Sequence, residues 1–207
     1  MKIGIFGTGR MGTKLAQIWA HNGHDIWLGS RDEERAIALA GELGHGIQGA
    51  GLPQTAAQAD ILTFAFPWFA LTDIVRMVDK LEGKIIIDCI NPTMSSGSLA
   101  LGHKWSAAEE IAQQFPLAHV VKAFNGIYYA NLDKPLYSGR AASLFYCSDY
   151  DNAKTAVAQL ATEMGFDPVD SGPLKHARYL EPLAVLWIQM AFHMGMGPEM
   201  AFTLLPR

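Results

Sequence analysis

The segment Gly7-Thr8-Gly9-Arg10-Met11-Gly12 follows directly on an apolar run over residues 3–6 and constrains the fold more than any other part of the chain. In such a segment the first glycine permits a tight turn, the second lets a phosphate approach the backbone, and the third lets a helix pack close to the sheet. An amphipathic stretch that includes Leu15 and Ile18 follows, and then a second apolar run over residues 25–29. This order predicts a strand, a helix and a strand, with a dinucleotide pyrophosphate at the N-terminus of the helix.

The residues after the second predicted strand favour NADP over NAD. An NAD site usually ends this strand with a carboxylate that binds the ribose 2′-hydroxyl, whereas here Gly29, Ser30 and Arg31 follow. Gly29 leaves room for a 2′-phosphate, Ser30 can donate a hydrogen bond to it, and Arg31 can pair with it. Arg35 lies four residues further on, one helical turn away, and is expected to reach the same group.

Asp32 is the argument for NAD, because it stands where the ribose carboxylate is usually found. Asp32-Glu33-Glu34 also fits the acidic first turn of a helix, where negative charge is favoured by the helix dipole. We therefore expect NADP, with Asp32 as a helix residue.

Composition restricts the classes of partner. The 207 residues fit one domain with a small appendage, and their net charge of −4 without a basic cluster argues against nucleic acid or an anionic membrane surface. Cys89 and Cys147 lack the spacing of a metal site, which predicts buried thiols in a reducing compartment and no metal. The first strand begins at once, which predicts no signal peptide. The longest apolar stretch, residues 182–197, is shorter than the ~20 residues of a membrane span. We expect a cytoplasmic protein without a membrane part.

Apolar runs alternate with amphipathic stretches along residues 1–172. Further strands are predicted over residues 61–66, 84–89, 119–124, 142–147 and 166–170. Helices are predicted over residues 32–43, 53–59, 68–81, 106–115 and 151–164, with a glycine-rich loop between the first two. This alternation predicts an α/β fold, a Rossmann-type doubly wound parallel sheet that forms the NADP-binding domain.

Residues 173–207 differ in kind and are predicted to form a C-terminal helical segment. From Leu174 onward apolar side chains cover most of a helix surface, Gly195, Gly197 and Pro198 interrupt it, and a short terminal helix is predicted over residues 199–205. A helix that is apolar on more than one face must be buried against the sheet or against another subunit. We expect this segment to close the pocket and to form a homodimer.

Ligands of open α/β sheets bind at the carboxyl ends of the strands, so the residues just past each strand are the site candidates. The expected cofactor contacts there are Phe66, Pro67, Asn91, Ala123 and Asn125. The expected substrate pocket consists of Trp68, Ile127, Tyr128, Met196 and Gly197. This apolar and aromatic lining suits a flat ring stacked on nicotinamide, so no catalytic side chain is expected. If a substrate needs a proton, the candidate donors are Lys122, His176 and Tyr128.

Several segments carry a family resemblance. Residues 1–35, with the glycine motif and Gly29-Ser30-Arg31, resemble the deazaflavin-dependent NADP reductases, the enzymes of coenzyme F420. The resemblance continues through Phe66-Pro67-Trp68, Asn131-Leu132-Asp133, Asp170-Ser171-Gly172-Pro173-Leu174 and the tail from Arg178 to Gly197. Lys122-Ala123-Phe124-Asn125 is similar to the cytoplasmic domain of the six-transmembrane ferric reductases, which passes hydride from NADPH to a flavin.

The resemblance implies a Rossmann fold, NADPH bound through Thr8, Ser30, Arg31 and Arg35, hydride transfer to a deazaflavin, and a homodimer built partly from C-terminal helices. The turn over residues 125–128 departs from the archaeal reductases, which leaves three functions open. The acceptor is coenzyme F420 or a flavin such as FMN or FAD; it is a small imine or carbonyl, as in the related pyrroline-carboxylate reductases; or the chain is a redox sensor that binds NADP(H) without turnover.

Overall fold

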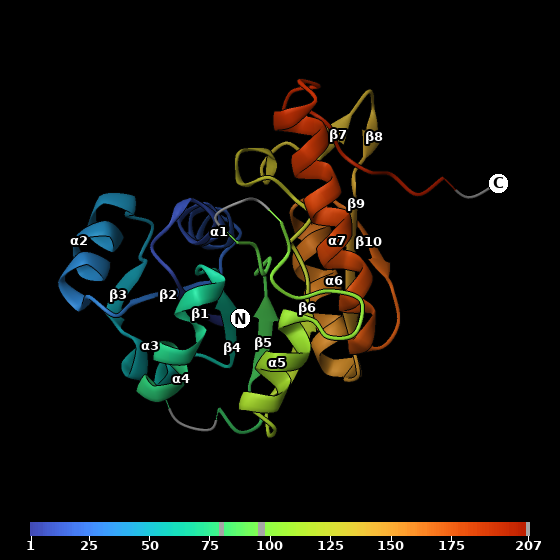
Figure 1. Cartoon of the computed structure of the whole chain (residues 1–207). Coiled ribbons are helices and arrows are strands. Elements are labelled where there is room, and N and C mark those ends of the chain that lie inside the picture. Colours follow the sequence, from blue (N-terminus) through green and yellow to red (C-terminus); the bar gives the residue numbers. More distant parts are fainter. Residues whose placement is uncertain (79–80, 95–97, 206–207) are drawn as a thin grey trace.

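A computed structural model describes residues 1–78, 81–94 and 98–205. A central sheet runs through the molecule, and helices cover both of its faces (Figure 1). Its eight strands in the described residues, in spatial order, are β3 (Gln48–Gly51), β2 (Asp25–Ser30), β1 (Lys2–Phe6), β4 (Ile61–Phe64), β5 (Ile85–Asp88), β6 (His119–Lys122), β9 (Ser143–Ser148) and β10 (Asp167–Asp170). A separate hairpin consists of β7 (Leu136–Tyr137) and β8 (Arg140–Ala141).

The helices follow the expected alternation. The α-helices of the described residues are α1 (Arg10–His21), α2 (Glu33–Leu43), α3 (Leu52–Gln58), α4 (Leu71–Met77), α5 (Ala107–Gln114), α6 (Asp151–Glu163) and α7 (Ala177–Ile188). Short turns of 3₁₀-helix are η1 (Trp68–Ala70), η2 (Tyr129–Asn131) and η3 (Leu174–His176), and a π-helical turn, η4 (Gln189–His193), extends α7. The helix expected over residues 68–81 is thus divided into η1 and α4, and residues 79–80 lie outside the described residues.

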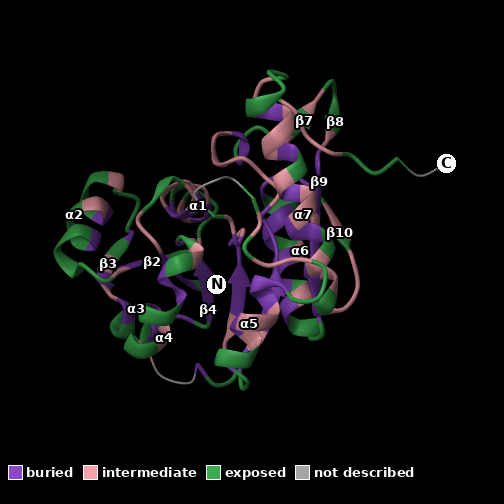
Figure 2. Cartoon of the chain, in the orientation of Figure 1, coloured by how far each residue is buried: buried purple, intermediate pink, exposed green. Residues whose placement is uncertain are grey.

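Two hydrophobic cores lie on opposite faces of the sheet. Neighbouring strand residues belong to different cores, because successive side chains of a strand point to opposite faces: Ile87 and Val121 pack with α1 and α6, and Ile86 and Val120 pack with α3, α4 and α5. Figure 2 shows the strands between them as buried. The prediction of a doubly wound Rossmann-type fold is confirmed.

The direction of the last two strands corrects the expected parallel sheet. β9 runs antiparallel to β6, with Val121 opposite Ser148, and β10 runs parallel to β9. A parallel neighbour needs a long crossover, usually a helix, whereas the chain between β6 and β9 contains only η2 and the β7–β8 hairpin. The apolar pattern of residues 142–147 predicts the strand but not its direction.

Strand β3 was predicted as a glycine-rich loop, and that prediction is wrong. A Cβ atom at Gly49 would lie 2.3 Å from the carbonyl oxygen of Ala36 in α2. The glycine therefore lets α2 pack directly on the strand, at the cost of the side chains that usually indicate a strand.

The predicted terminal helix over residues 199–205 is also wrong. This segment is extended and lies along the start of β9, where the Ser143 amide donates to the Phe202 carbonyl (2.9 Å) and the Leu204 amide donates to Ser143 Oγ (2.9 Å). Hydrogen bonds to a neighbouring strand replace those that a helix would form within itself.

An ion pair joins α5 to α7. Arg178 Nη2 lies 2.6 Å from Glu109 Oε1, and Arg178 Nε donates to Oε2 at 2.8 Å. The Ser106 amide donates to the same carboxylate (3.0 Å), and the Glu109 amide donates to Ser106 Oγ (3.2 Å), which closes the first turn of α5. Burial alone would raise the pKa of Glu109, but the hydrogen bonds from Arg178 and Ser106 outweigh it and hold the pKa below its ordinary value.

We expect this pair to make stability pH-dependent on the acid side. Because the pKa of Glu109 is lower in the folded chain than in the unfolded one, the pair stabilises the fold above the ordinary glutamate value and is lost as the pH falls through the folded value. The Glu109→Gln variant should be less stable than the unaltered chain at neutral pH and should converge on it between about pH 5 and pH 3. Urea midpoints measured across this range test the expectation, and parallel curves would contradict it.

Candidate active site

The glycine motif forms the turn between β1 and α1 at the carboxyl edge of the sheet. Gly7 has φ +133°, and a Cβ atom there would lie 2.3 Å from the Ala65 carbonyl oxygen. A Cβ atom at Gly12 would lie 2.1 Å from the Gly7 carbonyl oxygen, whereas one at Gly9 would meet nothing within 4 Å. Gly9 precedes α1, and no side chain caps this helix. The first amide groups of α1 therefore have no side-chain partner, and the backbone beside them at Gly9 is accessible. This is the arrangement that binds a pyrophosphate.

The end of β2 presents the residues expected at a 2′-phosphate. Arg31 is exposed and forms an ion pair with Asp73 of α4 (Nη1 to Oδ2, 3.2 Å). Asp32 caps α2, because its Oδ1 accepts from the Arg35 amide (3.1 Å), and its own amide donates to Ser30 Oγ (3.1 Å). The interpretation of Asp32 as a helix residue is confirmed.

Gly29 has a packing role in addition to the one expected. A Cβ atom at Gly29 would lie 2.9 Å from Thr55 Oγ1 in α3. Gly29 thus lets α3 pack closely on β2.

An open groove runs between α1 and α2 beside the glycine motif. The Arg10 guanidinium lies 5.5 Å from the centre of the Tyr129 ring, and Lys14 Nζ lies 2.5 Å from Asp133 Oδ2. The lining residues are Thr8, Gly9, Arg10, Thr13, Lys14, Gln17, Arg35, Ala38, Leu39, Glu42 and Tyr129. Three of these side chains carry positive charge and one carries negative charge, so the groove suits an anion.

A pocket of about 320 Å³ adjoins this groove; we call it the ring pocket. It is lined by Met11, Cys89, Asn91, Phe124, Asn125, Gly126, Ile127, Tyr128, Tyr129, Ala184, Trp187, Ile188 and Phe192. Tyr128 stacks on Trp187 at 5.6 Å with an interplanar angle of 24°, and Phe192 meets both rings edge to face at 5.6 and 5.9 Å. The lining contains no carboxylate, histidine or lysine among the described residues.

Two asparagines join the turns at the floor of the ring pocket. Asn91 Nδ2 donates to the Asn125 carbonyl (2.8 Å), and Asn125 Nδ2 donates to Asn91 Oδ1 (3.0 Å) and to the Leu180 carbonyl of α7 (3.1 Å). Phe124, between β6 and Asn125, has φ +62°, a conformation that is uncommon for any residue with a side chain. The turn after β6 is therefore held in a specific shape against α7.

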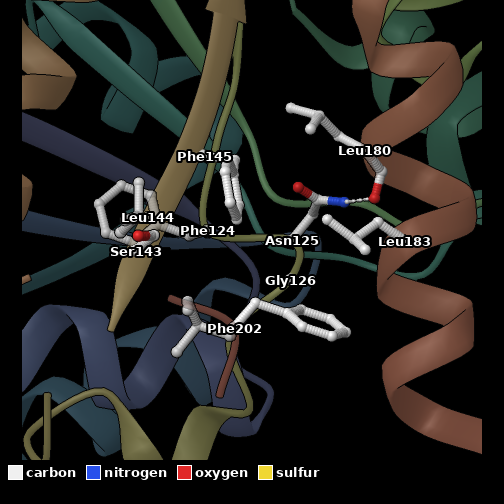
Figure 3. A pocket seen from close by; sticks show the side chains of 10 residues that line it. Phe124, Asn125, Gly126, Ser143, Leu144, Phe145, Leu180, Leu183 and Phe202 are labelled. Atoms are coloured by element: carbon white, nitrogen blue, oxygen red, sulfur yellow. Dashed lines mark hydrogen bonds between the residues drawn. The ribbon is translucent and has the colours of Figure 1, made fainter. Parts of the chain in front are cut away.

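A much smaller cavity lies on the other side of this turn. Figure 3 shows Asn125 reaching to the Leu180 carbonyl, with Phe145, Leu183 and Phe202 around the space. Its volume of about 20 Å³ is enough for a single water molecule. A ring ligand does not fit in this cavity.

The structure divides the expected site residues into three groups. The motif residues Thr8, Gly9 and Arg10 line the groove together with Arg35. Those that line the ring pocket are Met11, Asn91, Asn125, Ile127 and Tyr128. Those that line neither space are Gly7 and Gly12 of the motif, Ser30 and Arg31 at the end of β2, Phe66, which packs on Phe64 in the core, Pro67, Trp68, the buried Ala123, Met196 and Gly197.

Sequence reasoning missed part of the ring pocket. Cys89, Ala184, Trp187, Ile188 and Phe192 were not expected there. For Trp187 and Phe192 the signal was present, since both belong to the helix that is apolar on nearly all sides. Cys89 was expected to be a buried thiol, and it is; burial raises its pKa far above the ordinary value.

Neither Lys122 nor His176 is among the lining residues of the ring pocket. Lys122 is completely buried, with Nζ 2.7 Å from Asp88 Oδ2 and 2.9 Å from Glu181 Oε1. Burial lowers the pKa of the ammonium group, but the two carboxylates more than compensate and raise it. His176 Nδ1 lies 2.5 Å from the Ser171 carbonyl oxygen. Of the candidate proton donors, only Tyr128 lines the ring pocket.

Comparison with known proteins places the chain in a family. Residues 2–92 match the family described as "NADP oxidoreductase coenzyme F420-dependent". The F420-dependent NADP reductase of Methanothermobacter thermautotrophicus is 30% identical over 210 residues, which cover 92% of this chain and 89% of that protein. The chain belongs to the F420-dependent NADP reductase family. The prediction of an NADP-dependent oxidoreductase of this kind is thereby confirmed.

Further similarities extend beyond the F420-dependent NADP reductases. A crystal structure of a putative F420-dependent NADP reductase from Arthrobacter sp. FB24 superimposes with a TM-score of 0.91 at 28% identity and covers the whole of both chains. Metalloreductase STEAP3 of Rattus norvegicus is 33% identical over 187 residues, 89% of this chain but 37% of that protein. The chain thus spans well under half of the metalloreductase. No helix in the described residues is long and apolar enough to cross a membrane.

Proposed function

We propose that the protein transfers hydride between NADPH and a deazaflavin or flavin ring, coenzyme F420 being the first choice. The observation that carries this proposal is the ring pocket, an aromatic-walled space beside the N-terminus of α1 whose described lining holds no carboxylate, histidine or lysine. A flat ring needs stacking surfaces and correct placement, whereas imine or carbonyl reduction also needs a proton donor.

In this proposal NADPH lies along the carboxyl edge of the sheet. The amide groups at the start of α1 hold the pyrophosphate, and Ser30, Arg31 and Arg35 hold the 2′-phosphate with Thr8 beside them. Arg35 and Thr8 both line the groove next to α1, which supports this placement.

The residues of the ring pocket contribute by orientation and by excluding water. NADPH, when bound, supplies the hydride. Met11 of α1 and Asn91 after β5 line one part of the pocket, and Tyr128 and Trp187 give it a stacked aromatic surface. Holding two rings between these surfaces converts an encounter in solution into an oriented pair, which is the main requirement of hydride transfer between rings.

Turnover with different acceptors tests the proposal. We expect NADPH oxidation, followed anaerobically, with coenzyme F420 or with FMN or FAD, and none with a cyclic imine. Reduction of the imine that disappears in Tyr128→Phe would instead establish the imine-reductase function. Micromolar NADPH binding without turnover of any acceptor would establish the redox sensor.

Arg31 is expected to select NADPH. A charge-assisted contact with a phosphate contributes about 1.5–3 kcal/mol, so Arg31→Ala should raise the NADPH dissociation constant by about one to two decades and leave that of NADH nearly unchanged. Arg140→Ala, an exposed change of equal charge on β8, is the control. Equal losses for both cofactors in calorimetric titration would contradict the role of Arg31.

The proposal includes a division of the chain and a homodimer. Residues 1–172 bind NADP(H), and residues 173–207 close the pocket and form the dimer contact. Apolar side chains along α7 and beyond it remain exposed, among them Tyr179, Leu186 and Met194, which supports a contact here. Sedimentation equilibrium at micromolar concentration tests the homodimer, and the mass of one chain would reject it.

The buried thiols Cys89 and Cys147 suit a reducing compartment, so we place the activity in the cytoplasm.

A further inference from the structure

The buried ammonium group of Lys122 has three partners, which belong to three different parts of the fold. It donates to Asp88 Oδ2 at the end of β5 (2.7 Å) and to the carbonyl of Ile90 in the turn after β5 (2.5 Å), and it pairs with Glu181 Oε1 of α7 (2.9 Å). An ammonium group has three protons, so its donor capacity is completely used. The side chains of Lys122, Asp88 and Glu181 are all 0% exposed.

Both carboxylates carry this network into the backbone around them. Asp88 Oδ1 accepts from the Ile90 amide (2.8 Å), which fixes the turn that leads to Asn91. Glu181 accepts from the amides of Ala107 (3.2 Å) and Ala108 (3.4 Å) at the start of α5. Lys122 thus connects the turn after β5, the start of α5 and helix α7.

The turn after β5 and helix α7 both contribute residues to the ring pocket. Asn91, next to Ile90, binds Asn125, and Asn125 binds the Leu180 carbonyl beside Glu181. Ala184, Trp187 and Ile188 follow Leu180 and Glu181 along one face of α7, at spacings of three and four residues, and line the pocket. The distance between the asparagine floor and the aromatic wall therefore depends on where Glu181 holds α7.

We propose that Lys122 is a positioning residue, which sets the width of the ring pocket by holding α7 against the turns after β5 and β6. The effect of Lys122 on the KM for the acceptor rests on the proposed function. The displacement of α7 and of the two turns can be measured on the chain without any ligand. Lys122 is not among the residues that line the groove beside α1, so we expect the part of NADPH that binds in this groove to bind equally well without it.

Two variants test the role of Lys122. Glu181→Gln removes the charge that α7 contributes, and Lys122→Arg keeps the positive charge but replaces the compact ammonium by a planar fork that cannot reach three partners in the same directions. In both we expect the KM for coenzyme F420, or for FMN if that is the acceptor reduced, to rise about tenfold, because a displaced α7 takes part of the stacking surface away from the bound ring. The NADPH dissociation constant should change less than about twofold.

Glu109→Gln is the matched control, since it breaks a different ion pair of α7, the one between Arg178 and Glu109 of α5, and neither of these residues lines the ring pocket. We expect Glu109→Gln to leave the KM for the acceptor unchanged, although it should lower the stability of the fold as Glu181→Gln does. Equal rises in KM for Glu109→Gln and Glu181→Gln, or an unchanged KM in a folded Glu181→Gln, would overturn the proposal.

Amide hydrogen exchange without any acceptor provides the second measurement. In Glu181→Gln we expect faster exchange at residues 89–91 and 124–127 and no change at residues 9–13. If the unaltered protein reduces neither coenzyme F420 nor FMN, the proposed function fails, and exchange still decides the inference: unchanged exchange at both turns would overturn it.

Discussion

Replacing Lys122 by Met is expected to lower the free energy of unfolding by about 3–5 kcal/mol, because it leaves Asp88 and Glu181 buried without their cation. The total free energy of unfolding of a typical domain is only about 5–15 kcal/mol, so this loss should appear as a large shift of the urea midpoint. The pKa of Glu181 is already raised by burial despite the neighbouring ammonium, and without Lys122 it should rise further.

That rise determines how the stability of Lys122→Met depends on pH. A carboxyl group whose pKa is raised in the folded state costs stability above its unfolded pKa, and the cost disappears as the group is protonated. Lys122→Met should therefore gain more stability than the unaltered chain as the pH falls from neutral toward the ordinary glutamate value. The double variant Lys122→Met/Glu181→Gln should lose less than Lys122→Met alone at neutral pH. Simple addition of the two single losses would show that the residues do not interact.

Gly9→Ala and Gly12→Ala should separate cofactor binding from folding. The Cβ atom of Gly9→Ala meets nothing within 4 Å, so we expect unaltered stability but a large loss of NADPH affinity, on the order of a hundredfold, because the backbone can no longer approach the pyrophosphate. The Cβ atom of Gly12→Ala would lie 2.1 Å from a backbone oxygen that cannot move aside, so the fold itself should lose about 1–3 kcal/mol or more.

Thermal unfolding and calorimetric titration of both variants provide the measurements. Unaltered NADPH affinity in Gly9→Ala would contradict the placement of the pyrophosphate at α1. Unaltered stability in Gly12→Ala would show that α1 can move away from β1 without cost.

The fold could be predicted from the sequence where a signal is local. Long apolar runs such as residues 61–66 and 119–124 indicate buried strands by themselves, and the glycine motif indicates its own turn. Strand β3 could not be recognised, because a glycine is needed at position 49 for the backbone of α2 to pack against the strand. The residues of β3 alone carry no sign of that contact. The direction of β9 depends likewise on the length and content of the connection before it.

The candidate site divides in the same way. Residues next to strand ends, such as Asn91 and Tyr128, could be proposed because the carboxyl edge of the sheet collects them. Trp187 and Glu181 could not, because they reach the same place from the far end of the chain. Lys122 could be named from the sequence only as a candidate proton donor, because its partners Asp88 and Glu181 are separated from it by 34 and 59 positions in the sequence.

The reversal of β9 has a consequence for how this architecture can diversify. Because β9 and β10 run toward the amino edge of the sheet, α7 starts at that edge and rises to the carboxyl edge, where its last turns meet the ring pocket (Figure 1). Each residue inserted before Trp187 would lift the aromatic wall by about 1.5 Å and rotate it by about 100°. If the proposed function holds, the choice of acceptor can therefore change through the length of one helix without any change in residues 1–172.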